Sequence, residues 1–140
     1  MNSNFPVNSE MAKSELIKFH YYSIFLRKDD IIQIQLKEHF VCEVEDVKNM
    51  ERSIKQLSGN KKHPLLSIYP SFNSYSKEAL AYVSKLNLTS ADALVGSGAL
   101  FNMIGNFYLK LNKPVRPSKL FNNTEDALEW LQQFLPPTPL

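Results

Sequence analysis

The single cysteine, Cys42, is the first side chain in this 140-residue sequence that could act as a nucleophile. His39 precedes it by three residues, and an expected helix begins just after it, where the helix dipole can lower the pKa of a thiol. A nucleophile also needs an oriented base and a pocket for the developing oxyanion, and the sequence offers no candidate for either. A Cys-dependent enzyme is therefore the third of three functional hypotheses, and we expect no catalytic residues.

The three histidines, His20, His39 and His63, lie far apart in three different expected elements. No carboxylate lies at metal-ligand spacing from any of them, so we expect no metal site and no cofactor. A single cysteine excludes both an internal disulfide and a zinc site built from several cysteines, and it is typical of a reducing compartment. We therefore expect the protein to be cytoplasmic.

Gly96, Ser97 and Gly98 follow an expected strand and open an expected helix, where backbone N–H groups can bind an anion. Phe101 stands where a dinucleotide-binding motif has its third glycine, and no acidic residue follows about 20 positions later to bind a ribose. A tight turn between strand and helix is the favoured interpretation. The three residues stay a weak candidate for an anion site.

The periodicity of apolar residues predicts a complete α/β domain. Alternation over 20–28 and 32–36 predicts a hairpin whose strands each have an apolar and a mainly polar face. The remaining expected elements are helix 44–58, strand 64–69, helix 76–86, strand 91–95, helix 98–112, strand 118–121 and a helix from 124. The order ββαβαβαβα favours a mixed, mostly parallel sheet with an antiparallel hairpin at its N-terminal edge.

The helix expected at 98–112 carries one apolar stripe, which we expect to face the core. The stripe consists of Leu100, Ile104, Phe107, Tyr108 and Leu111. Leu109 falls instead among the polar residues, beside Asn102 and Asn106. It is either part of a contact surface or core that the last helix or the segment 114–117 covers.

Length and composition favour one domain at 15–135, between a flexible segment 1–14 and a Pro-rich tail 136–140. A net charge of +2 without a basic cluster argues against nucleic-acid binding. No apolar run reaches the roughly 20 residues of a membrane span, and residues 1–6 lack a secretory signal pattern.

The segment 104–114, Ile-Gly-Asn-Phe-Tyr-Leu-Lys-Leu-Asn-Lys-Pro, resembles an uncharacterised bacterial family with the SpoIIAA-like, or STAS-like, fold. Segments 29–37, 45–47, 119–121 and 127–131 continue the resemblance, which covers about residues 20 to 135. It implies a compact α/β domain without an established activity. In fold, such a domain is related to anti-sigma-factor antagonists and more loosely to the SEC14 lipid-binding fold.

Anti-sigma-factor antagonists are switched by phosphorylation of a serine at the start of the helix after the third strand. The resemblance places that position near Ser71, Ser74 and Ser76. Tyr69-Pro70-Ser71 stands where those proteins have an acidic residue and the serine. None of these serines is therefore assigned as a phosphorylation site.

The leading hypothesis is a non-enzymatic regulatory or protein-interaction module that binds a protein partner or a second copy of itself. In the second case it would form a homodimer. Its expected surfaces are the start of the second helix and the polar side of the third, with the residues Ser74, Ser76, Lys77, Asn102, Asn106 and Leu109. The alternative is a carrier of a small molecule or lipid, with a groove lined by Phe101, Phe107 and Tyr108. A core without a cavity of about 300 Å³ or more would exclude that alternative.

Overall fold

A computed structural model of the chain describes residues 17–18, 21–70 and 74–137. The predicted flexible segment 1–14 and the last three residues of the predicted tail lie outside these residues, as do His20 and Ser71. Strands and helices alternate in the order expected from the periodicity, and short strands are added to them.

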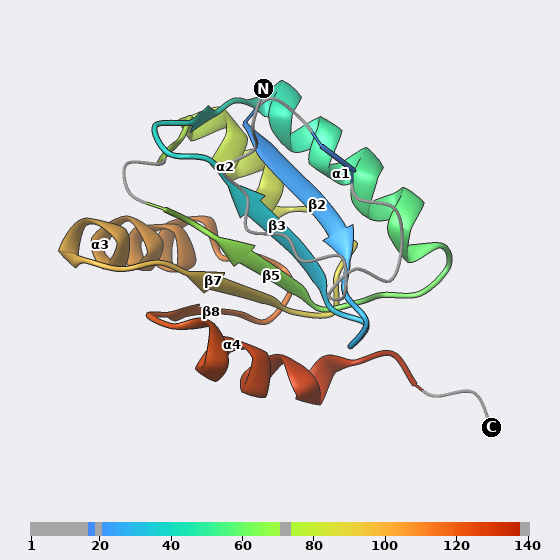
Figure 1. The fold of residues 1–140 in the computed structure, drawn as a ribbon. Helices are drawn as coiled ribbons and strands as arrows, with labels where there is room; N and C mark the ends of the chain where they lie inside the picture. Colours follow the sequence, from blue (N-terminus) through green and yellow to red (C-terminus); the bar gives the residue numbers. More distant parts are fainter. Residues whose placement is uncertain (1–16, 19–20, 71–73, 138–140) are drawn as a thin grey trace.

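A six-stranded sheet forms the centre of the fold (Figure 1), with the strand order β1-β2-β3-β5-β7-β8. Its strands are β1 (Ile17–Lys18), β2 (Tyr22–Leu26), β3 (Ile32–Leu36), β5 (Leu65–Ile68), β7 (Asp92–Val95) and β8 (Ser118–Phe121). The pairs β1–β2 and β2–β3 are antiparallel, and all later pairs are parallel. The predicted hairpin followed by a parallel sheet is thereby confirmed.

A second, two-stranded sheet pairs β4 (Val41–Cys42) with β6 (Ser74–Tyr75) in parallel. Neither strand was expected, and neither was β1. Each has only two residues, which is too short to show a period of two in the sequence. This small sheet joins the start of the first helix to the start of the second.

The helices are α1 (Val44–Ser58), α2 (Lys77–Ser84), α3 (Ala99–Phe107), the π-helical turn η2 (Tyr108–Asn112), α4 (Thr124–Leu131) and the 3-10 turn η3 (Gln132–Phe134). Gly59 ends α1 at φ 63°, a conformation in which glycine lacks the steric penalty of other residues. Ser76 caps α2, since its hydroxyl accepts a hydrogen bond from the Ala79 amide at 3.1 Å. Both ends agree with the expectations from the sequence.

The sheet separates two apolar layers (Figure 1), with α4 on one face and α1 and α2 on the other. Along β5, Leu65 belongs to the core under α1, and Leu66 belongs to the core under α4. This alternation follows from the period of two in a strand.

The alternation correctly groups the apolar side chains of the hairpin on one face, but the second, mainly polar face is buried as well. All five residues of β2 are buried, including Ser23 and Phe25, and Gln33 on β3 is buried beside them. The Gln33 amide oxygen accepts a hydrogen bond from Arg27 at 2.7 Å. Alternation indicates which side chains share a face, but whether that face is covered depends on packing from elsewhere in the chain.

The expected core face of α3 is also wrong. Leu100, Ile104, Phe107 and Leu111 of the predicted stripe are exposed, and Tyr108 alone among its members is buried. The reason is Gly105, where a Cβ would lie only 2.7 Å from the Leu120 methyl carbons of β8. The helix approaches the sheet through its glycine, and this turns much of the apolar stripe away from the core.

Candidate functional site

A cavity of about 480 Å³ lies between the sheet and the three helices α1, α2 and α3. Its walls are mainly aliphatic, with Ile34 and Leu94 from the sheet, Met50 and Ile54 from α1, and Leu80 and Val83 from α2. Close-packed protein interiors seldom contain voids much larger than a water molecule. The volume instead lies within the range of about 300–1,000 Å³ that is typical of ligand pockets.

The helix α3 forms one wall of this cavity through Phe101, Ile104 and Tyr108. The Phe101 ring lies 6.0 Å from the ring of Tyr69, measured between centroids. The predicted carrier groove named Phe101, Phe107 and Tyr108. Two of these three side chains line the cavity, whereas Phe107 is 57% exposed and is not among the lining residues.

Two tyrosines place hydroxyl groups in this apolar surrounding. Tyr69 follows β5 and Tyr75 lies in β6, and their hydroxyl oxygens are 3.1 Å apart. Burial raises the pKa of both phenols. Each hydroxyl therefore stays protonated at neutral pH and can both donate and accept a hydrogen bond.

A buried ion pair forms the second polar group at the cavity. Arg116 Nε donates to Asp92 Oδ2 at 2.6 Å, and both side chains are less than a tenth exposed. Thr89 Oγ1 donates to the other Asp92 oxygen at 2.6 Å. Arg116 also donates to the carbonyl oxygens of Val83 and Leu86, at 2.8 and 3.1 Å, and thereby holds the C-terminal end of α2.

Sequence reasoning missed this ion pair. Asp92 lies within the strand expected at 91–95. An aspartate there was the available signal, because strands of a parallel sheet are buried and a buried carboxylate needs a partner. Nothing in the local pattern identified Arg116 as that partner, since 24 residues separate the two.

Cys42 has the opposite of the environment that a nucleophile needs. Its side chain is buried, and burial raises the pKa of the thiol, with further contributions from Asp46 and Glu43. The neutral thiol is the poorer nucleophile. Among the described residues, no group of three or more His, Cys, Asp or Glu side chains could hold a metal ion.

Gly96, Ser97 and Gly98 form the turn from β7 into α3. A Cβ at Gly96 would lie 2.5 Å from the Phe101 ring, and Gly98 has φ 92°. Both glycines thus have conformational or packing reasons to be there. Ser97 is exposed at the rim of the cavity.

The predicted interaction residues lie on two separate elements. Ser76 is half-buried as the cap of α2, and Lys77 beside it is exposed; for Ser74 the structure describes the backbone alone. On the third helix, Asn106 is exposed, while Asn102 and Leu109 are half-buried.

Two comparisons with solved structures involve bacterial proteins. One is an uncharacterised protein from the DUF3478 family with a SpoIIAA-like fold, from Shewanella loihica PV-4. It is 18% identical, with 86% of this chain and 98% of that chain covered, at a TM-score of 0.56. The other is a protein of unknown function from Arthrobacter sp. FB24. It is 25% identical, with 79% of this chain and 92% of that chain covered, at a TM-score of 0.30.

No curated protein matches the chain. None of the helices in the described part of the structure is long and apolar enough to cross a membrane. A family model described as a domain of unknown function, DUF7793, matches residues 24–135, which is most of the sequence. The expected resemblance is confirmed at the level of the fold: the chain belongs to the DUF7793 family and has a SpoIIAA-like fold.

Proposed function

We propose that this protein is a binding module for a small, largely apolar molecule held between the sheet and the helices α1, α2 and α3. The observation that carries the proposal is the cavity of about 480 Å³ with the hydrogen-bonded Tyr69 and Tyr75 among its lining residues. An apolar space with a few polar groups is the usual form of a ligand site. Apolar ligand atoms would supply the dispersion contacts that the lining side chains lack.

The polar groups narrow the class of ligand. The hydrogen bond between Tyr69 and Tyr75 uses one of their two hydroxyl hydrogens, so the other can be donated to a ligand oxygen. The charge of Arg116 is matched by Asp92, so the ion pair leaves no net charge for a counter-ion. We therefore propose an uncharged ligand with an apolar body and one carbonyl or hydroxyl group.

A fluorescence titration with N-phenyl-1-naphthylamine tests this proposal, because this uncharged probe brightens in apolar surroundings. Val83→Trp places an indole in the cavity wall, and Val41→Trp makes the same change at a residue that is 53% exposed and not part of that wall. We expect saturable binding that weakens about tenfold or more in Val83→Trp and stays unchanged in Val41→Trp. Equal binding by all three proteins, or no saturable binding by the unmodified protein, would overturn the proposal.

A module that binds a protein partner or a second copy is the second candidate. The exposed Lys77 and Asn106 fit the two predicted surfaces, whereas the half-burial of Leu109 weakens the expectation that it makes a contact. Native mass spectrometry of the untagged protein separates the candidates. A dimer without added mass favours partner binding, and a retained small mass favours the ligand-binding module.

A further inference from the structure

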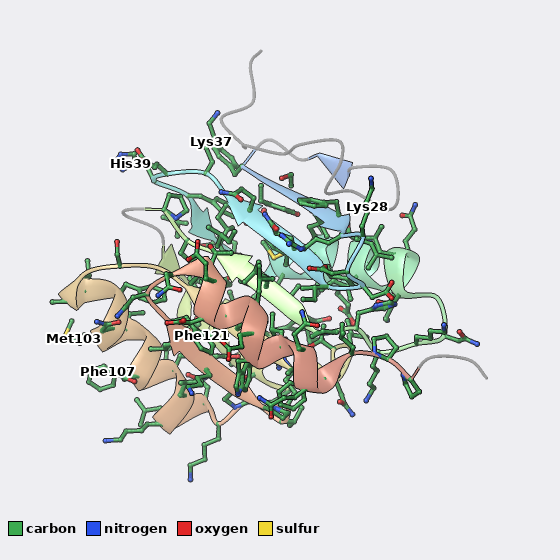
Figure 2. All side chains as sticks on the ribbon, turned by 60° about the horizontal axis from the view of Figure 1, so that its bottom comes forward. Lys28, Lys37, His39, Met103, Phe107 and Phe121 are labelled. Carbon is green, nitrogen blue, oxygen red and sulfur yellow. The ribbon has the colours of Figure 1, made fainter. Side chains whose placement is uncertain are left out.

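We infer that the outer face of α3 and η2 docks on the surface of an anionic lipid bilayer. The first observation is a set of large apolar side chains that the fold leaves in solvent. Leu100, Met103, Phe107 and Leu111 are 55%, 53%, 57% and 73% exposed. Figure 2 shows Met103 and Phe107 on the outer side of α3, pointing away from the rest of the molecule.

The spacing of these four residues makes them one surface. Steps of three and four residues return to the same side of a helix, so the four form a stripe along α3 and η2. Val115, in the loop that follows, is 62% exposed as well. Single exposed apolar residues are ordinary, but a contiguous stripe indicates a surface that contacts another apolar phase.

The distribution of charge indicates which phase that is. Residues 93–124 contain no Asp or Glu, and they carry Lys110, Lys113 and Lys119 besides Arg116, whose charge is matched by the buried Asp92. Apart from this ion pair and the three lysines, the chain holds twelve basic and thirteen acidic residues, so the net positive charge comes from these lysines. Lys110 and Lys113 are exposed at the end of the apolar stripe. Each lysine near an anionic leaflet contributes about 1 kcal/mol of attraction.

The helix has the dimensions of an interfacial element. The 14 residues from Ala99 to Asn112 extend roughly 20 Å, which is shorter than the hydrocarbon core. Such a helix lies in the plane of the headgroups with its apolar side chains inserted. The polar residues beside the stripe include Lys110 and Lys113, which are exposed and cationic, and residues 93–124 contain no Asp or Glu. This charge matches anionic headgroups, so we favour the bilayer over a protein partner.

The stripe is also continuous with the cavity. Leu100 and Ile104 line the cavity and are 55% and 38% exposed, so apolar surface extends from the interior to the outer side of α3. The inference that a ligand enters the cavity from the bilayer rests on the proposed function. Docking itself does not.

Vesicle flotation tests the docking surface. The full chain is mixed with phosphatidylcholine vesicles, either alone or with about 30% phosphatidylserine, at low and at physiological ionic strength. We expect partition into the anionic vesicles that is about tenfold or more stronger than into the uncharged ones and that weakens with salt.

Two variants separate the insertion of side chains from charge attraction. Phe107→Glu combined with Leu111→Glu should reduce partition about tenfold or more, because both carboxylates would enter the headgroup region. Lys110→Gln combined with Lys113→Gln should remove the preference for anionic vesicles. Val41→Glu is the matched control, since it adds a carboxylate at an exposed apolar residue elsewhere and should leave partition unchanged.

Three outcomes would overturn the inference. They are an absence of partition into either vesicle, equal loss in Val41→Glu and the double glutamate variant, and a solution dimer that the double glutamate variant converts to monomers. The last outcome would assign the stripe to a second copy of the chain. Binding of N-phenyl-1-naphthylamine without vesicles is measured on the same samples, so that failure of docking and failure of the cavity proposal remain distinguishable.

Discussion

The helices α3 and α4 cover opposite faces of the same strand pair, β7 and β8, yet they bury very different shares of their apolar residues. In α4, Ala127 and Leu131 are completely buried, and the Trp130 ring lies 5.6 Å from Phe121 and 4.9 Å from Phe134. In α3, Gly105 is the one buried residue of nine. Ordinary core packing accounts for α4, whereas the apolar residues of α3 need a ligand, a membrane or a partner to account for them.

The strand side chains explain part of this difference. Toward α4, the sheet presents Ala91 and Ala93, whose small side chains allow a helix to approach closely. Toward α3, the same segment presents Asp92 and Leu94, and both line the cavity. On the α4 side, the small side chains of this segment allow close packing. On the α3 side, the segment borders the cavity, and Asp92 forms the buried ion pair with Arg116 there.

The largest loss of stability is expected at the ion pair between Asp92 and Arg116. Asp92→Ala leaves the Arg116 guanidinium buried without its carboxylate, and breaking a buried pair in this way costs about 3–5 kcal/mol. Urea unfolding followed by the fluorescence of Trp130, the one tryptophan, measures the loss. A second variant that replaces both residues by Leu should recover much of it. An Asp92→Ala protein as stable as the unmodified one would show that the ion pair does not stabilise the side of the sheet that borders the cavity.

The next effect compares the two helices directly. Leu131→Ala removes a fully buried side chain from α4 and should lower the free energy of unfolding by about 2–5 kcal/mol. Leu111→Ala makes the same change at a residue that is 73% exposed, so it should alter stability by about 0.5 kcal/mol or less. Equal losses in the same urea experiment would mean that the outer face of α3 is packed after all.

A smaller effect is expected at the turn into α3. The Cβ of Gly96→Ala would meet the Phe101 ring and push it toward the cavity, so we expect a loss of about 1–3 kcal/mol together with weaker probe binding. Gly59→Ala is the control, because a Cβ there meets nothing within 4 Å, although φ 63° strains the backbone. It should lower stability without changing the affinity for the probe. Unchanged probe affinity in Gly96→Ala would show that the position of the Phe101 ring does not affect the binding site.

The smallest effect concerns pH and the contact between α1 and α2. Tyr82 donates a hydrogen bond to Glu51 at 2.6 Å, which lowers the pKa of that carboxyl below its ordinary value of 4.5, and Lys55 lowers it further. A lowered pKa in the folded state stabilises the protein above pH 4.5, and this contribution disappears as the pH falls through the lowered pKa.

The substitution Tyr82→Phe should therefore be slightly destabilising at neutral pH. The difference from the unmodified protein should shrink as the solution becomes more acidic than pH 4.5. Thermal unfolding at a series of pH values measures this trend. A difference that grew toward acidic pH would contradict the assignment of the contact to an ionised Glu51.

Much of the fold follows from local patterns. The bounds of α1 agree with the helix expected at 44–58, and α2 begins at Lys77, one residue after the start of the helix expected at 76–86. The α2 helix ends at Ser84, two residues earlier than expected. Arg116, from far along the chain, holds the carbonyl oxygens at this end, and no local signal contains that contact.

The residues of the candidate site also fall into those that the sequence could identify and those that it could not. Phe101 and Tyr108 could be named as cavity residues from their place on the third helix, because their types and spacing are local information. The roles of Asp92, Tyr69 and Tyr75 could not, since they arise where segments far apart in the sequence bring side chains together.

The sequence by itself thus determined the class of fold, the order of the main elements and the helix starts, because periods and caps involve residues within a few positions of each other. The tertiary structure decided which apolar faces are buried. A stripe of apolar residues indicates a helix face but not the direction in which that face points, and the close approach of Gly105 to Leu120 turned it outward. A long-range contact of this kind depends on how the whole chain packs, and it leaves no period in the sequence.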